Sequence, residues 1–174
     1  MLELLSQKGG KNITDKVTDF PTRLLLATDG SEDATFAART AVNLANKTGS
    51  ELHVVYVEEM PGRFSNSKPT SLERLIDPEF EEKMRQLAEA AASQRLTEQV
   101  QKIKEAGGQI AQAHAKFGRP HAEIVHLAEE LDAGIVVVGR RGEGGVRKAL
   151  LGSVSDSVVR HAHCPVLVVR KEDQ

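Results

Sequence analysis

Short apolar runs alternate with longer segments of helical periodicity along most of this chain. Five runs predict strands, at residues 23–28, 51–57, 109–116, 135–139 and 165–169. Most of them are continuously apolar, which is typical of strands that are covered on both faces. Apolar residues spaced three and four apart predict helices at residues 32–48, 79–106, 120–132 and about 153–161.

Residues that end or begin helices support these boundaries. Gly49 and Gly107 stand where two of the predicted helices stop, and Pro120 stands at the first position of the third helix. Strands that alternate with helices predict an α/β fold of the Rossmann-like kind. We therefore expect an open parallel sheet with helices on both faces and right-handed crossovers.

Two details refine this picture. The run at 109–116 has polar residues on one face, so it is expected at a sheet edge, where Lys116 protects it from further pairing. The long helix at 79–106 has one apolar stripe, which we expect to be buried along its whole length. That stripe consists of Phe80, Met84, Leu87, Ala91, Leu96, Val100 and Ile103.

Two segments lie outside the repeating pattern. Residues 1–21 are polar and end at Pro21, which predicts a mobile N-terminal extension ahead of a single domain at 22–171. Residues 58–78 contain three prolines and predict a long loop, with one helical turn near 71–76. Two roles remain open for this loop: a lid over a nearby site, or plain disorder.

Composition excludes several classes of function. The chain has 174 residues, a net charge of −2 and 3% aromatic residues, so nothing indicates a nucleic-acid surface. Cys164 is the only cysteine, which excludes an intrachain disulfide and a cysteine-rich metal site. No run is long enough to span a membrane and no secretory leader is recognised, so we expect a cytoplasmic protein.

The most informative segment separates the last two predicted strands. It reads Gly139-x-x-Gly142, then nine residues, then Gly152-Ser153 at a helix start. Glycines let backbone amides approach an anion, and a helix N-terminus supplies unpaired N–H groups. Asp156 follows Ser153 by three residues, the spacing of a capping box. Phosphate is the anion that suits this loop best; the alternative is a flexible connector.

A second polar segment, Ala27-Thr28-Asp29, follows the first strand. If the first and fourth strands are neighbours, both segments border one crevice at the carboxyl ends of the sheet. Asp29 has a competing interpretation as a turn or N-cap residue, and Asp33 is equally placed to cap the first helix. Neither a Walker A loop nor the GxGxxG dinucleotide fingerprint is present.

These residues resemble the universal stress protein family. The similarity lies in the opening LLLATDGSEDATFAARTAVNLA, the G-x2-G-x9-G-S spacing and the final CPVLVV, and it covers roughly residues 22–170. The resemblance implies five parallel strands in the order 3-2-1-4-5, which makes strands one and four neighbours. It also implies ATP binding, because the glycine motif marks the members of the family that bind ATP.

The resemblance assigns residues to the two ends of the nucleotide. Val57 packs on adenine, and the remaining residues on the adenosine side are Ala27, Thr28, Asp29, Val138 and Gly139. The phosphate side comprises Arg141, Gly142, Gly152, Ser153, Val154 and Ser155, through backbone amides and the two serine hydroxyls. The side chains of Arg140 and Arg141 are expected to face solvent. Mg²⁺ or Mn²⁺ is expected with the triphosphate, held by phosphate and water because no acidic cluster is visible.

Three hypotheses for the function follow. The first is an ATP-binding regulatory protein with at most slow hydrolysis, since no general base is apparent. The second is a protein-interaction module of the same fold that holds no nucleotide, and the third is a dedicated ATPase or phosphotransferase. The apolar strand at 165–169 is implied to pair across a two-fold axis in a homodimer. His161, His163 and Cys164 are interpreted as structural or surface residues.

Overall fold

The computed structural model describes residues 22–59, 78–142 and 151–171. The strands are β1 (Arg23–Ala27), β2 (Glu51–Glu58), β3 (Ile110–Phe117), β4 (Ile135–Gly139) and β5 (Val166–Val169). The helices are α1 (Glu32–Thr48), α2 (Pro78–Glu105), α3 (Pro120–Glu130) and α4 (Ser153–His161). These bounds agree with the predicted elements to within two residues at each end.

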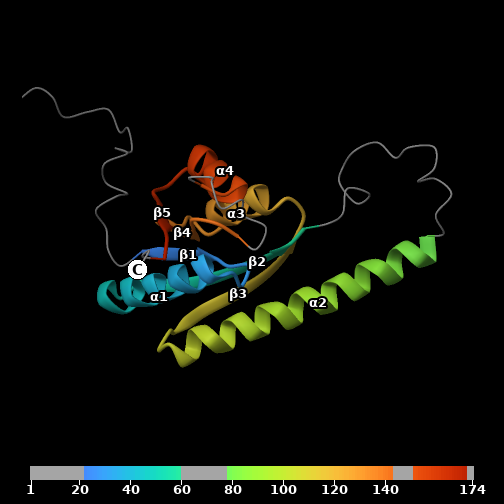
Figure 1. Ribbon diagram of the computed structural model, residues 1–174, viewed down its shortest axis with the longest axis horizontal. Coiled ribbons are helices and arrows are strands. Elements are labelled where there is room, and N and C mark those ends of the chain that lie inside the picture. The colour runs from blue at the N-terminus through green and yellow to red at the C-terminus, as the bar shows by residue number, and fades with distance from the viewer. Residues whose placement is uncertain (1–21, 60–77, 143–150, 172–174) are drawn as a thin grey trace, which may run out of the picture.

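The five strands form one parallel sheet in the order β3-β2-β1-β4-β5, as the resemblance implied. β1 is central and pairs with β2 on one side and β4 on the other, with Ala27 opposite both Val55 and Val138. β3 and β5 are the two edges, so the prediction that 109–116 lies at an edge is confirmed. The sheet separates α1 and α2 from α3 and α4 (Figure 1).

Two cores hold these layers together. Alternate residues of each strand point to opposite faces, so Leu24 and Leu26 pack toward α1 and α2 while Leu25 packs toward α3 and α4. All three leucines are fully buried. Burial on both faces explains why the strand sequences are continuously apolar.

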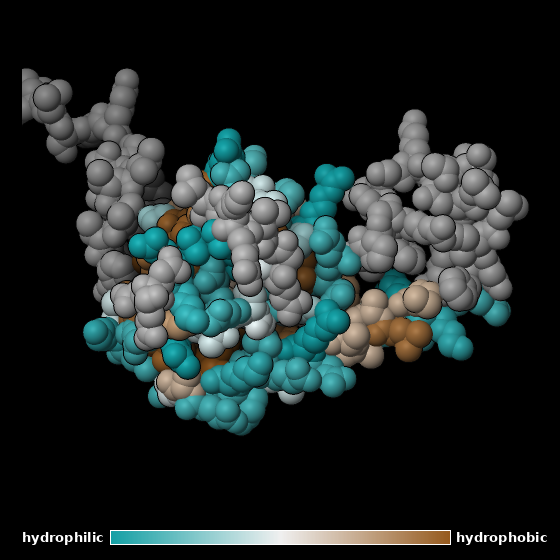
Figure 2. All heavy atoms as spheres, in the orientation of Figure 1, coloured by the Kyte–Doolittle hydropathy of each residue, from teal (hydrophilic) through white to brown (hydrophobic). Residues whose placement is uncertain are grey.

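The prediction of one buried stripe along α2 was wrong for its first half. Leu96 and Ile103 are buried against the sheet, but 57% of Leu87 and 43% of Met84 are exposed. A helix turns by about 100° per residue, so Leu87 lies on the side opposite Leu96. The first half of α2 also extends beyond the sheet, leaving apolar surface there (Figures 1 and 2). The side chain of Phe80 lies outside the described structure.

The residue that caps α1 is neither of the aspartates considered from the sequence. Ser31 is the N-cap, and its hydroxyl oxygen accepts the Ala34 N–H at 3.2 Å. Asp29 precedes it as a turn residue, because its Oδ1 accepts the Ser31 N–H at 3.0 Å. This leaves Asp33 in the first turn of α1 with a carboxylate that is available to other partners.

Several predictions lie outside the described residues. They concern the extension at 1–21, the helical turn near 71–76 and the lid hypothesis for most of 58–78. Within the described ranges, no helix is long and apolar enough to cross a membrane. The same ranges contain no group of three or more histidine, cysteine, aspartate or glutamate side chains that is arranged to hold a metal ion.

A pair of histidines links β2 to the edge strand β3. His53 Nδ1 and His114 Nε2 are 3.3 Å apart, so one ring donates an N–H to the other. Only 6% of His53 is exposed, and its Nε2 has no hydrogen-bond partner among the described residues. Burial lowers the pKa of His53, and the opposing effect of Glu51 is smaller. Burial also lowers the pKa of His114, with further lowering from His53 and Lys116.

This pair predicts a loss of stability in mild acid. An unfolded histidine has a pKa of about 6.5, so as the pH falls through that value the unfolded chain binds protons that the folded pair resists. The free energy of unfolding should therefore fall between about pH 7 and pH 5. Urea titrations across this range should show a shallower pH dependence for His53→Gln. The exposed His163→Gln variant should behave as wild type, and equal slopes in all three proteins would contradict the assignment.

Candidate functional site

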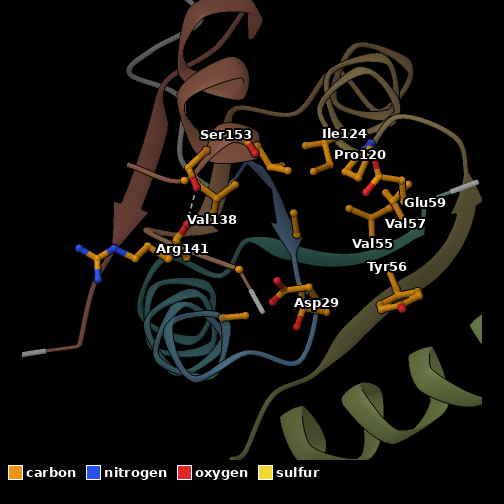
Figure 3. A pocket seen from close by; sticks show the side chains of 18 of the residues that line it. Asp29, Val55, Tyr56, Val57, Glu59, Pro120, Ile124, Val138, Arg141 and Ser153 are labelled. Atoms are coloured by element: carbon orange, nitrogen blue, oxygen red, sulfur yellow. Dashed lines mark hydrogen bonds between the residues drawn. The ribbon is translucent and has the colours of Figure 1, made fainter. Parts of the chain in front are cut away.

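The carboxyl ends of β1 and β4 lie side by side and open into one cavity of about 540 Å³ (Figure 3). This volume is within the usual range for small-molecule sites. The structure brings all of the site residues predicted from the sequence to its lining: Ala27, Thr28, Asp29, Val57, Val138, Gly139, Arg141, Gly142, Gly152, Ser153, Val154 and Ser155.

The floor of the cavity is the turn from β1 into α1. The Thr28 hydroxyl accepts the Gly30 N–H at 3.3 Å, and Asp29 Oδ1 accepts the Ser31 N–H. These local bonds hold the Asp29 carboxylate at the cavity floor, where Figure 3 shows it. The Ser31 hydroxyl donates to the Arg141 carbonyl at 3.2 Å. This bond connects the turn to the glycine loop, which is the segment 139–152 between β4 and α4.

Gly142 allows the two loops to approach closely. A Cβ atom placed on Gly142 would lie 2.4 Å from Asp29 Oδ2, which is closer than real side-chain contacts allow. Any other residue here must displace the Asp29 carboxylate. The second glycine of the motif therefore has two explanations. It leaves room for the Asp29 carboxylate on the opposite wall of the cavity, and it lets backbone amides approach an anion.

The N-terminus of α4 forms the wall opposite β2. Gly152 is its N-cap, and the first intrahelical bond runs from the Asp156 N–H to the Gly152 carbonyl at 2.9 Å. The amides of Ser153, Val154 and Ser155 therefore have no acceptor within the helix. The predicted capping box is wrong, because the helix begins one residue earlier than that motif requires. Asp156 instead pairs with Arg160, one turn further along.

Ser155 is placed differently from the expectation that its hydroxyl contacts phosphate. Only 4% of Ser155 is exposed, and its hydroxyl lies 2.8 Å from the Gly139 carbonyl and 3.1 Å from that of Arg140. Its proton is thus directed to the glycine loop. Ser153 is exposed at the mouth of the helix end, so its hydroxyl is better placed for a ligand.

At the other end of the cavity, backbone N–H and C=O groups of β2 form part of the wall. The Thr28 N–H donates to the Val55 carbonyl at 3.0 Å, so the backbone groups of Val55 face β1. Backbone groups alternate sides along a strand, and those of Val57 therefore face the same way. Because β1 has already ended at Ala27, the Val57 N–H and C=O border the open cavity. They form an adjacent donor and acceptor.

Sequence reasoning missed nine further lining residues: Ala34, Val55, Tyr56, Glu58, Glu59, Arg95, Pro120, Ile124 and Leu151. Val55, Pro120 and Ile124 extend the apolar wall beside Val57 (Figure 3). Such a wall suits a planar aromatic group better than a charged one. Tyr56 and Glu58 are the direct neighbours of Val57 in β2. Their place next to a predicted site residue is the signal that could have identified them as lining residues.

A polar cluster closes the cavity on the side of α2. Arg95 Nη1 donates to the Tyr56 hydroxyl at 2.9 Å and lies 3.2 Å from the Glu58 carboxylate. The Tyr56 hydroxyl in turn donates to Glu58 Oε2 at 2.9 Å. Burial raises the pKa of Tyr56, so its hydroxyl stays protonated and keeps this bond near neutral pH.

The two arginines after β4 are placed differently from one another. The Arg141 guanidinium points away from the cavity, and the residue contributes its backbone to the lining (Figure 3). The Arg140 side chain is only 19% exposed and lies beside Asp33 rather than in solvent. The reason is that Arg140 follows β4 directly, where the N-terminus of α1 packs against the sheet.

Comparison with known proteins agrees with this geometry. The family model described as "Universal stress protein family" matches residues 21–170. The chain belongs to the universal stress protein family. Universal stress protein MJ0531 of Methanocaldococcus jannaschii is 31% identical over 164 residues, which are 94% of this chain and 86% of that protein.

Solved structures of universal stress proteins share the fold. UspA from Lactobacillus plantarum superposes with a TM-score of 0.69 at 23% identity, covering 87% of this chain and 99% of that one. A universal stress protein in complex with cAMP superposes with a TM-score of 0.61 at 25% identity, covering 87% and 98%. At least one protein of this family therefore binds an adenine nucleotide.

The contact between Gly142 and Asp29 predicts non-additive mutational effects in this universal stress protein. Gly142→Ala should cost about 1–3 kcal/mol of stability, because the new methyl group displaces the Asp29 carboxylate. The same substitution should cost much less in an Asp29→Ala background, where the obstruction is gone. Denaturant unfolding of the two single variants and the double variant measures the difference. Additive costs would mean that the two loops do not meet at these atoms.

Proposed function

We propose that this universal stress protein binds ATP in the cavity at the carboxyl ends of β1 and β4 and uses its occupancy as a regulatory switch. The adenine lies in the apolar end beside Val57, and the phosphates lie at the N-terminus of α4. The unit that does this is the domain at 22–171, and we expect it to act in the cytoplasm.

One observation supports the proposal: groups that suit an anion and groups that suit a nucleobase lie at opposite ends of one cavity. The amides of Ser153 and Val154, which have no acceptor within α4 and lie next to Gly142 and Gly152, suit phosphate oxygens. The Val57 N–H and C=O suit N1 and the amino group of adenine. Guanine presents a donor and an acceptor in the reverse order, so this edge favours adenine.

The lining supports binding more than rapid hydrolysis. Of its described acidic side chains, Glu58 is paired with Arg95, and Asp29, which lies against Gly142, accepts the Ser31 N–H through Oδ1. Because these carboxylates have partners of their own, we expect none of them to act as an efficient general base. Mg²⁺ or Mn²⁺ would be held chiefly by phosphate and water and would neutralise their charge. Slow or absent turnover suits a switch, since occupancy then reports the nucleotide supply.

The first test is a titration of the purified protein with ATP and magnesium by calorimetry, after mass spectrometry of any nucleotide that co-purifies. We expect ATP to bind and GTP to bind at least about tenfold more weakly. Equal affinity for ATP and GTP would contradict recognition of adenine by the Val57 backbone. If neither nucleotide binds, the proposed function is wrong.

Gly152→Val should abolish ATP binding while the fold persists. A Cβ at Gly152 already lies 3.3 Å from the Arg140 carbonyl and the Arg141 Cα, and the valine methyls extend further into the phosphate site. Circular dichroism should remain that of wild type, while ATP affinity falls by more than about tenfold. Gly152→Ala, which adds only the Cβ, should give a smaller loss. Unchanged affinity in the valine variant removes the phosphate assignment.

A second candidate function, a dimeric interaction module that holds no nucleotide, is favoured by the β5 edge. Leu167 in β5 is 37% exposed and Val159 in the adjacent α4 is 45% exposed. An apolar edge strand without a partner invites pairing with another chain. We propose a homodimer through β5, which is compatible with either function; the ATP titration decides between them.

Leu167→Glu should weaken this dimer by about tenfold or more, because a carboxylate replaces apolar contact at the interface. Sedimentation velocity over a range of concentrations measures the change. Leu87→Glu is the matched control, since Leu87 is the same residue type and is more exposed, at 57%, but lies on α2. If the Leu87 variant dissociates instead, the interface is on α2 and the β5 proposal is wrong.

A further inference from the structure

Arg140, in the segment that follows β4, contacts three elements of the fold: β5, α4 and α1. Its N–H donates to the carbonyl of Val169, the last residue of β5, at 2.6 Å. Its carbonyl accepts the N–H of Gly152, the N-cap of α4, at 2.8 Å. The Ser155 hydroxyl also lies 3.1 Å from that carbonyl. The backbone of Arg140 thus connects the edge strand to the start of α4.

The side chain of Arg140 adds α1 to this junction. Its Nε lies 3.7 Å from Asp33 Oδ2, in the first turn of α1, and the two side chains are only 19% and 13% exposed. Arg140 Nε is buried and has no hydrogen-bond partner among the described residues. The attraction is therefore ionic at this distance, and the guanidinium depends on the Asp33 carboxylate for charge compensation.

Asp33 also contacts the chain that follows β5. Its second oxygen, Oδ1, accepts the Lys171 N–H at 3.2 Å. One carboxylate therefore contacts both the residue that begins the glycine loop and the segment that leaves the edge strand. This contact lies outside the cavity, because neither Asp33 nor Arg140 belongs to its lining.

We propose that Asp33 and Arg140 form a joint that couples the phosphate end of the cavity to the β5 edge. Both are positioning residues. The backbone of Arg140 leads directly into Arg141 and Gly142 on one side of the phosphate site, and its carbonyl holds Gly152 on the other. A ligand that binds both sides of the phosphate site stabilises the position of the Arg140 backbone. That backbone also makes the hydrogen bond to Val169 that fixes the end of β5. Coupling of this kind is reciprocal, so order at β5 favours the ligand in turn.

This inference rests on the proposed ATP site, and its test separates the two. Asp33→Asn keeps the size of the side chain but removes its charge from Arg140. Glu32→Gln is the matched control: Glu32 is the neighbouring residue on α1 and pairs with the Lys171 side chain instead of with Arg140. ATP affinity is measured by calorimetry, and amide exchange of the segment 165–171 is measured with and without ATP.

In the wild type and in Glu32→Gln, ATP should slow exchange across 165–171. In Asp33→Asn, ATP affinity should fall about fivefold or more, and ATP should no longer slow exchange in this segment. If Asp33→Asn is too unstable to analyse, the double variant Asp33→Asn with Arg140→Gln removes both charges and should show the same uncoupling. Wild-type affinity together with wild-type protection in either variant overturns the joint.

Failure of the ATP site gives a different pattern. If the wild type binds no ATP, the proposed function fails, and the joint is tested in the protein without nucleotide. Asp33→Asn should then exchange faster than wild type and Glu32→Gln across 165–171. Equal exchange in all three proteins would mean that Asp33 does not fix the edge strand, and the joint would be rejected as well.

Discussion

The early end of β1 is the constraint on which the rest of this structure depends. β1 stops at Ala27, opposite Val55, whereas β2 continues to Glu58. Polar backbone groups of β2 are therefore left beside a gap in the middle of the sheet, and an unpaired backbone group in a protein interior is costly. The gap stays open because the chain turns into α1 through local bonds at Thr28 and Asp29. A ligand with its own donor and acceptor would pair with these backbone groups, as the proposed adenine does.

The fold and the main lining of the cavity could be predicted because their signals are local. Continuously apolar strands, the glycine spacing and the polar residues after the first strand each occur within a few neighbouring positions. Arg95 could not be predicted in the same way. It reaches Tyr56 and Glu58 from a helix whose placement depends on how Leu96 and Ile103 pack on the sheet, which no short motif encodes.

Other errors arose where one residue had two partners to choose from. Ser153 and Asp156 have the spacing of a capping box, yet Gly152 is the N-cap of α4 and Asp156 binds Arg160. Arg140 was expected in solvent because its loop is polar, yet it follows β4 immediately and meets the buried side of α1. The partner of Arg140 lies on α1, whose position is set by tertiary packing, so that choice is invisible in the local sequence. The partner of Asp156 is only four residues away, so there the local sequence offered two alternatives.

The division of α2 into a packed half and a projecting half has an evolutionary consequence. The packed half contributes Leu96 and Ile103 to the core, so substitutions there act on the whole domain. Among the described side chains, the core includes none from the projecting half, and the ion pairs of Arg85 with Glu82 and Glu89 lie within the helix itself. Whole turns can therefore be added to or removed from that half without moving the sheet or the cavity. It is the part of the scaffold on which lineages can diverge in length and surface while the cavity stays the same.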